Sequence, residues 1–149
     1  MSSNSFTNKS SIIIRQLKNL VYVSPRDERL VPTAANITQW WALWDTGATG
    51  TVISQRVVDA LHLQAISYQK CQTPSGVYDA ECYYIDIWLP NKVVIKKILV
   101  TKAQELFCGF DILIGMDIIT FGDFAVSNFN KKTSFSFRIP SEAEIDFSK

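Results

Sequence analysis

The chain has 149 residues, of which 47% are hydrophobic and 19% are charged, and its 15 basic and 14 acidic side chains give a net charge of +1. That length suits one domain with its own core and is too short for two substantial domains. No block of like charge stands out, so nothing recommends a nucleic-acid partner or an anionic membrane surface.

Residues 1–10 are polar and rich in Ser and Asn, and we expect a disordered N-terminal tip. They lack the basic-then-apolar order of a secretory signal, and the apolar runs of the chain are far too short to cross a bilayer. The segment from Ser11 to Val23 is rich in Ile and Val and is β-prone. Pro25 and Pro32 bracket a charged stretch that is predicted to be an exposed loop.

A second β-prone run, Ile37 to Trp44, leads directly into Asp45-Thr46-Gly47-Ala48-Thr49-Gly50. Strand character resumes at Thr51. Ser54 is then expected to cap a short helix from Gln55 to Leu63, whose apolar residues face inward.

The strand before Asp45 carries three tryptophans. Alternation places Trp40 and Trp44 on one face of the strand and Trp41 on the other. Core packing is the expected role of these rings, and a dimer contact or the wall of a substrate pocket is the alternative.

Two further strands, Ser67 to Thr73 and Val77 to Leu89, are predicted around Pro74-Ser75-Gly76, which is typical of a hairpin turn. Pro90-Asn91 marks another turn. The run from Val93 to Thr101 is predicted to be the strand that follows it.

Cys108-Gly109 opens a long apolar run. Its part up to Ile114 is predicted to be a buried strand, and the part after Gly115 a short helix that ends near Gly122. A final hairpin follows, with strands from Phe124 to Phe129 and from Thr133 to Ile139, and residues 141–149 are a polar tail. Many short strands with one or two brief helices predict a single mostly β domain over residues 11–140.

Histidine and cysteine content narrows the possible chemistry. The single histidine, His62, lies in a helical pattern and is expected to be exposed or half-buried, so a histidine-rich zinc site is excluded. Cys71, Cys82 and Cys108 are odd in number and form no CxxC pair, which indicates reduced thiols and a cytoplasmic location. Cys108 is expected to be a buried structural thiol. Any catalysis must therefore depend on carboxylates.

The segment around Asp45 has features that hold an acid rigidly. A strand of bulky residues delivers the carboxylate into a tight turn of small residues. Gly47 permits a backbone conformation or a close approach that a side chain would block. Ala48 keeps the space beside the carboxylate narrow but open.

Three segments together resemble the retropepsin-like aspartic proteases. Asp45-Thr46-Gly47-Ala48 resembles their active loop, and Ile112-Leu113-Ile114-Gly115 resembles the strand that runs behind it. The hairpin tip Thr73-Pro74-Ser75-Gly76, extended to Val77, stands where this family places its flap. Each segment alone could be a plain turn or core strand, but their order and spacing favour the family.

The resemblance implies a retropepsin-like half-lobe, which is a closed β-barrel with one or two short helices. Peptide hydrolysis by carboxylates needs one ionised group and one protonated group. Two adjacent carboxyl groups share a proton because both cannot ionise cheaply. Since this chain contains Asp-Thr-Gly once, at Asp45, the second aspartate is expected from another copy across a two-fold axis.

The resemblance also implies roles for the loop. Asp45 is the catalytic acid or base, Thr46 bonds the partner's loop, and Gly47 and Ala48 line the floor of the cleft. An extended peptide would bind beneath the flap, Thr73 to Val77, as an added strand. No metal, organic cofactor, nucleic acid or membrane is expected to take part.

Some positions depart from the retroviral pattern. Thr49 replaces the usual acidic residue, and Met116 followed by Asp117 replaces the usual Arg after Gly115. Retroviral salt bridges at the dimer interface are therefore in doubt. Two alternatives stay open, namely a non-catalytic module of this fold that dimerises or binds peptides, and an unrelated β-rich structural protein.

Overall fold

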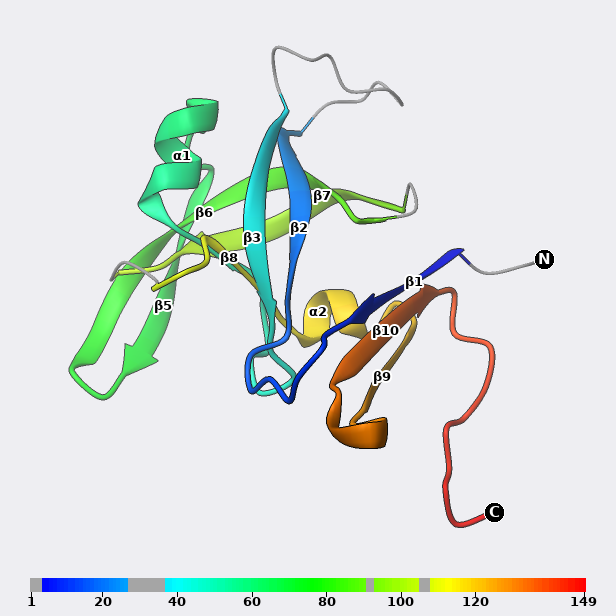
Figure 1. Cartoon of the computed structure of the whole chain (residues 1–149). Coiled ribbons are helices and arrows are strands. Elements are labelled where there is room, and N and C mark those ends of the chain that lie inside the picture. The colour runs from blue at the N-terminus through cyan, green and yellow to red at the C-terminus, as the bar shows by residue number, and fades with distance from the viewer. Residues whose placement is uncertain (1–3, 27–36, 91–92, 105–107) are drawn as a thin grey trace.

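A computed structural model describes residues 4–26, 37–90, 93–104 and 108–149 (Figure 1). The predicted loop from Pro25 to Pro32 lies largely outside these residues, as does Asn91 of the turn before the next strand. The strands are β1 (Asn4–Lys9), β2 (Lys18–Pro25), β3 (Thr38–Trp44), β4 (Val52–Ile53), β5 (Ser67–Thr73), β6 (Gly76–Trp88), β7 (Val94–Lys102), β8 (Ile112–Ile114), β9 (Asp123–Ser127) and β10 (Ser134–Ile139). The helices are α1 (Gln55–Leu61), α2 (Met116–Ile119) and the 3-10 turn η3 (Phe129–Lys131).

Six strands close into a barrel. They are hydrogen-bonded in the order β2-β3-β8-β4-β7-β6, and β6 pairs again with β2 to complete the circle. β5 extends the sheet beyond β6 as the outer arm of a hairpin. The predicted mostly β barrel with short helices is confirmed.

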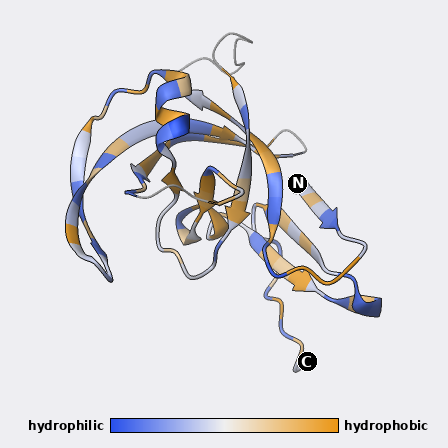
Figure 2. Ribbon diagram, turned by 60° about the vertical axis from the view of Figure 1, so that its left-hand side comes forward, coloured by the Kyte–Doolittle hydropathy of each residue, from blue (hydrophilic) through white to orange (hydrophobic). Residues whose placement is uncertain are grey.

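The barrel interior is filled by alternate residues of its strands, which face inward. Its fully buried side chains include Val21 and Val23 of β2, Ile85 and Ile87 of β6, and Val100 of β7. Hydrophobic segments accordingly gather at the centre of the molecule (Figure 2). No helix among the described residues is long and apolar enough to cross a bilayer.

A second sheet, ordered β1-β10-β9, shares the core of the barrel. The prediction that residues 1–10 are disordered is wrong for Asn4–Lys9, which pair antiparallel with β10 over their whole length. The physical reason is Phe6, which is buried and lies 5.8 Å from the Trp44 ring, centroid to centroid. Polar composition misled the prediction because the other face of β1 is polar and points outward.

The segment 141–149 contains no helix or strand and is mostly exposed, but its start is anchored. The Asp123 carboxylate accepts hydrogen bonds from the Ser141 hydroxyl, the Glu142 amide at 2.8 Å and the Arg138 guanidinium at 2.7 Å. These donors, the Ser141 hydroxyl first, hold the pKa of Asp123 well below its usual value.

The lowered pKa predicts how this anchor responds to acid. A carboxyl group with a depressed folded-state pKa contributes stability above its unfolded pKa of about 3.9 and loses it as pH falls through the folded value. We expect the Glu142 amide to stay protected from hydrogen exchange at pH 4, relative to its free-peptide rate, and to lose protection only at lower pH. Asp123→Asn should remove the protection throughout, whereas Asp146→Asn, farther along the tail, should not. Loss of protection above pH 4 in the unmodified chain would contradict the assignment.

Candidate active site

The loop between β3 and β4 presents Asp45 directly after the buried Trp44 at the end of β3. The Asp45 amide donates to the Ile114 carbonyl at 2.9 Å, which ties the loop to β8. The Gly47 amide donates to Asp45 Oδ1 at 2.8 Å, and the Ala48 amide to the Asp45 carbonyl at 3.2 Å. The carboxylate is thus fixed through one oxygen, while the side chain is half-buried and Thr46 beside it is exposed.

Gly47 does not have a left-handed backbone conformation. A Cβ at this position would lie 3.2 Å from Asp45 Oδ1, so a side chain would crowd the carboxylate. Of the two reasons predicted for a glycine here, the structure therefore favours close approach over unusual backbone geometry.

β8 runs directly behind the loop. It pairs in parallel with β3, placing Ile114 beside Trp44 and Leu113 beside Leu43. At Gly115 a Cβ would meet the Gly50 carbonyl oxygen at 2.7 Å, so only a glycine lets the two backbones approach this closely.

The start of α2 completes the attachment. The Met116 amide donates to the Ala48 carbonyl at 2.8 Å, and the Asp117 amide to the Thr49 carbonyl at 3.2 Å. The loop is therefore supported by a backbone that crosses directly beneath it.

Asp117 is a supporting residue that sequence reasoning did not assign. Its carboxylate accepts from the Thr51 hydroxyl at 2.7 Å and from the Thr51 amide at 3.0 Å. The Thr51 hydroxyl oxygen also accepts from the Gly115 amide at 3.2 Å. The Gly-Met-Asp departure indicated an acid in the first turn of a helix, where it can bind backbone amides, but nothing in it indicated Thr51 as a partner.

The predicted flap is a hairpin of β5 and β6 that projects from the barrel (Figure 1). Its tip is a two-residue turn, Pro74-Ser75, between the paired residues Thr73 and Gly76. Gly76 has φ +127°, a conformation that L side chains rarely adopt, and the Thr73 hydroxyl donates to its carbonyl at 3.1 Å. Val77 beside this tip is 64% exposed.

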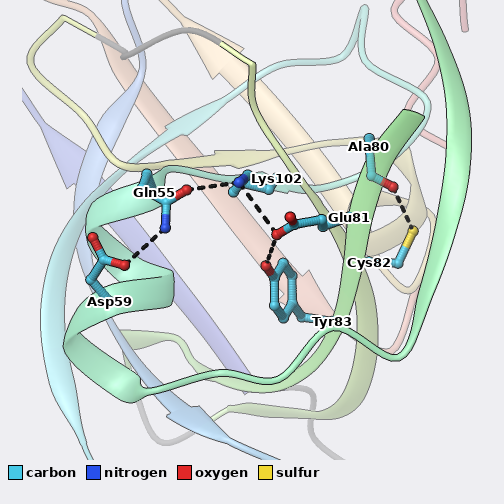
Figure 3. A network of polar contacts seen from close by, with 7 residues as sticks. All are labelled: Gln55, Asp59, Ala80, Glu81, Cys82, Tyr83 and Lys102. Atoms are coloured by element: carbon cyan, nitrogen blue, oxygen red, sulfur yellow. Dashed lines mark hydrogen bonds and ion pairs between the residues drawn. The ribbon is translucent and has the colours of Figure 1, made fainter. Parts of the chain in front are cut away.

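A polar network fixes the base of this hairpin to α1 and β7 (Figure 3). Lys102 lies 3.3 Å from Glu81 and donates to Gln55 at 2.7 Å, and Tyr83 donates a short hydrogen bond to Glu81. The Tyr83 hydroxyl and then Lys102 lower the pKa of Glu81, and burial followed by Glu81 raises the pKa of Tyr83. The Lys102 charge is matched by Glu81, so the network fixes the base of the hairpin.

The tryptophans follow the predicted alternation. Trp44 is buried, Trp40 packs partly against the core, and Trp41 is 49% exposed on the opposite face.

The prediction that Cys108 is buried is wrong, because this thiol is exposed in the segment before β8. All three cysteines are free thiols.

Two further details concern α1 and metals. Ser54 stands at the N-cap of α1, but its hydroxyl donates to Asp111 at 2.8 Å instead of accepting from the helix. His62 is exposed and ends the helix with φ 51°. Across the described ranges, no group of three or more His, Cys, Asp or Glu side chains is arranged to hold a metal ion.

Comparison with known proteins adds to this geometry. Residues 31–118 match the family described as aspartyl protease. A retropepsin-like aspartic protease from Rickettsia conorii superposes with a TM-score of 0.59 and 11% identity, covering 93% of this chain and 97% of that one. EIAV protease in complex with the inhibitor HBY-793 superposes with a TM-score of 0.50 and 17% identity, covering 70% and 86%. These identities show a shared fold, and no curated protein matches the sequence.

Proposed function

The chain belongs to the aspartyl protease family, and from this premise we propose that it is a homodimeric aspartic endopeptidase. In this proposal, water is activated between two Asp45 carboxylates, one from each copy. The proposal rests on the burial and hydrogen bonding of the Asp45 carboxylate. The carboxylate is half-buried and oriented by the Gly47 amide, and Oδ2 has no hydrogen-bond partner among the described residues.

A single Asp45 is insufficient for this chemistry. One carboxylate must take a proton from water while a protonated carboxyl group polarises the peptide carbonyl. Two such groups in contact favour a shared proton because their joint ionisation is costly. The symmetric partner would supply the second group, with Thr46, which is exposed beside Asp45, bonding the partner's loop.

The substrate would be an extended polypeptide held between the loop and the flap. The outer arm β5 is largely exposed, and the tip residues Pro74 and Ser75 are exposed as well. A peptide that binds as an added strand would place its backbone against such elements, and closure of the hairpin would exclude bulk water. The three free thiols support a reducing compartment such as the cytoplasm.

β9 offers an edge for the second copy. Among the described strands it pairs with β10 alone, so its outer edge carries unpaired backbone groups. Val126 lies on the same face as the buried Phe135, opposite it in register, yet is 43% exposed. A second β9 added antiparallel across a two-fold axis would cover this edge.

This edge is close to the loop. Phe124 of β9 stacks on Trp44 with ring centroids 5.5 Å apart, and Trp44 directly precedes Asp45. An axis that passes beside β9 would thus also pass near the two aspartates, which is the geometry that a shared site needs.

The shared site predicts that activity depends on concentration. We expect the protein to cleave denatured casein, and its specific activity to fall on dilution as the dimer dissociates. Val126→Lys should shift both the sedimentation of the dimer and the loss of activity to higher protein concentrations, whereas Val77→Lys on the flap should leave sedimentation unchanged. Constant specific activity from a species that sediments as a monomer would exclude the shared site. A stable dimer without cleavage would favour the non-catalytic alternative.

A further inference from the structure

The Trp44 indole joins the barrel to the second sheet. It belongs to β3 and is 4% exposed, and phenylalanines from all three strands of the second sheet pack around it. Phe124 of β9 stacks on it, with ring centroids 5.5 Å apart and planes inclined by 10°. Phe6 of β1 and Phe137 of β10 lie at 5.8 Å and 5.0 Å in tilted arrangements. The position of the second sheet on the barrel therefore depends on the orientation of this ring.

One buried hydrogen bond sets that orientation. The Trp44 Nε1–H group donates to Asn19 Oδ1 at 2.8 Å, and Asn19 is 3% exposed. An indole N–H group can only donate, so the oxygen of the amide faces it. Asn19 pairs with Ala42 across β2 and β3, which places the amide diagonally opposite Trp44 on one face of the sheet. Stacking tolerates several rotations of a ring, whereas this hydrogen bond requires one.

Asn19 serves here through its oxygen alone. Asn19 Nδ2 is buried and has no hydrogen-bond partner among the described residues. A buried donor without an acceptor costs stability, and two apolar side chains at positions 19 and 44 would pack without that cost. A buried amide that is only half satisfied therefore has a purpose other than stability. The structure indicates that this purpose is the acceptor that Asn19 offers to Trp44.

Trp44 is connected to the shared site in two ways. Asp45 is the next residue, and its amide donates to the Ile114 carbonyl at 2.9 Å, so the loop follows the barrel. The stacked Phe124 ring connects Trp44 to β9, whose outer edge would meet a second β9 in the dimer proposed above. A rotation of the Trp44 ring would move β9 while Asp45 stayed with the barrel. Two-fold symmetry would double that displacement between the two Asp45 side chains.

We propose that Asn19 is a positioning residue of the shared site. By fixing the rotation of the Trp44 ring, it holds the β9 edge at the distance from Asp45 that brings the two carboxylates of the dimer into contact. This inference rests on the proposed homodimeric peptidase, and it adds a core residue that acts on the site through Trp44.

Two substitutions remove the same hydrogen bond from opposite ends. Asn19→Leu keeps the size of the side chain and removes the acceptor, and Trp44→Phe keeps a stacking ring and removes the donor. Each should lower kcat by about tenfold with KM within about twofold, at protein concentrations where only dimer sediments. The double variant leaves no unpaired group from this bond, so it should fold.

A double-mutant cycle tests whether the bond itself matters. If it does, the double variant should have a kcat no lower than that of the slower single variant, because the second substitution removes nothing further. If the two losses multiplied, the residues would have independent packing roles and the proposal would be wrong.

Ser24→Ala is the matched control. Ser24 is a buried residue of β2 whose hydroxyl oxygen accepts from the Trp88 indole N–H at 3.2 Å, about 17 Å farther along the strand. Its loss should leave kcat unchanged, even if the thermal unfolding midpoint falls as far as it does in Asn19→Leu. Equal losses of kcat in the two variants would make the effect one of general stability and would overturn the proposal.

A titration of Asp45 separates this inference from the proposed function, because it needs no turnover. The carboxyl carbons of isotope-labelled aspartate are followed by NMR, and the Asp45 signal is identified by its loss in Asp45→Asn. Two carboxyl groups in contact titrate in two steps, and the steps move together as the groups separate. Asn19→Leu should narrow the interval between the steps by about one pH unit, and Ser24→Ala should not.

The outcomes of this titration are distinct. Narrowing in Asn19→Leu alone supports the inference even if the unmodified protein cleaves nothing. An interval that Asn19→Leu leaves unchanged overturns the inference and leaves the proposed function standing. A single step in the unmodified dimer would show that the two carboxylates do not meet, which would overturn the shared site and this inference with it.

Discussion

Asp45→Asn is expected to lower kcat/KM for peptide cleavage by about a thousandfold or more. The amide cannot accept the proton of the attacking water, and a pair of such amides cannot share a proton. The fold should persist, because the Asn oxygen can still accept from the Gly47 amide that binds Asp45 Oδ1 at 2.8 Å. The measurement is cleavage of a fluorogenic peptide, with the thermal unfolding midpoint recorded for both proteins.

Asp59→Asn is the matched control, because Asp59 is an exposed acid on α1 whose carboxylate accepts a hydrogen bond from the Gln55 side chain at 2.8 Å. It should retain full activity. Turnover by Asp45→Asn at the unmodified rate would remove Asp45 from the mechanism.

Mixed dimers sharpen the same prediction. If each copy supplies one carboxylate, an excess of Asp45→Asn chains should convert active dimers into inactive mixed ones. Activity of a fixed amount of unmodified chain should then fall toward zero as the variant is added. If it stayed constant while mixed dimers formed, each chain would hold a complete site.

The second large effect is expected at Gly115. A Cβ there would lie 2.7 Å from the Gly50 oxygen, 2.8 Å from the Gly50 carbonyl carbon and 2.9 Å from the Ala48 oxygen. Because all three atoms are backbone, the loop between β3 and β4 must move, and Gly115→Ala should lower the free energy of unfolding by about 3 kcal/mol. Activity should fall too, since the loop that moves carries Asp45. Urea unfolding at equilibrium measures the first effect.

Gly50→Ala is the matched control from the other side of the same contact. A Cβ at Gly50 meets no heavy atom within 4 Å, and Gly50 does not have a positive φ. Gly115 itself has φ −99°, which any residue can adopt, so the difference between the variants isolates the steric contact. Equal destabilisation of the two variants would show that backbone freedom, and not close approach, explains the glycine.

Most of the barrel could be predicted from local patterns. The hairpin of β5 and β6 was predicted at Ser67–Thr73 and Val77–Leu89 and found at Ser67–Thr73 and Gly76–Trp88, because Pro-Ser-Gly between two β-prone runs determines a turn locally. The position of Ile112–Ile114 behind the loop was expected only from the family resemblance. No local signal specifies which strand a buried apolar run will pair with, and here it is β3, in parallel.

The errors share one cause. β1 is polar by composition, and Phe6 is its single buried residue. Phe6 anchors the strand by packing against Trp44 and the β10 phenylalanines, which follow far later in the chain. The exposure of Cys108 likewise depends on how the segment before β8 packs. Hydrophobic and polar patterns within a few residues cannot identify packing partners that are distant in the sequence.

The sequence by itself determined the alternation of β3 and the narrow turn at Asp45, because these follow from side-chain size and strand periodicity within a few residues. The need for glycine at position 115 is a tertiary effect, since the atoms that a Cβ there would meet belong to Gly50 and Ala48. Tertiary structure alone decided that Asp117 holds Thr51 and that Lys102 links Glu81 to α1. Each of these joins residues from separate strands and helices. Their contacts arise only when barrel closure brings distant parts of the chain together.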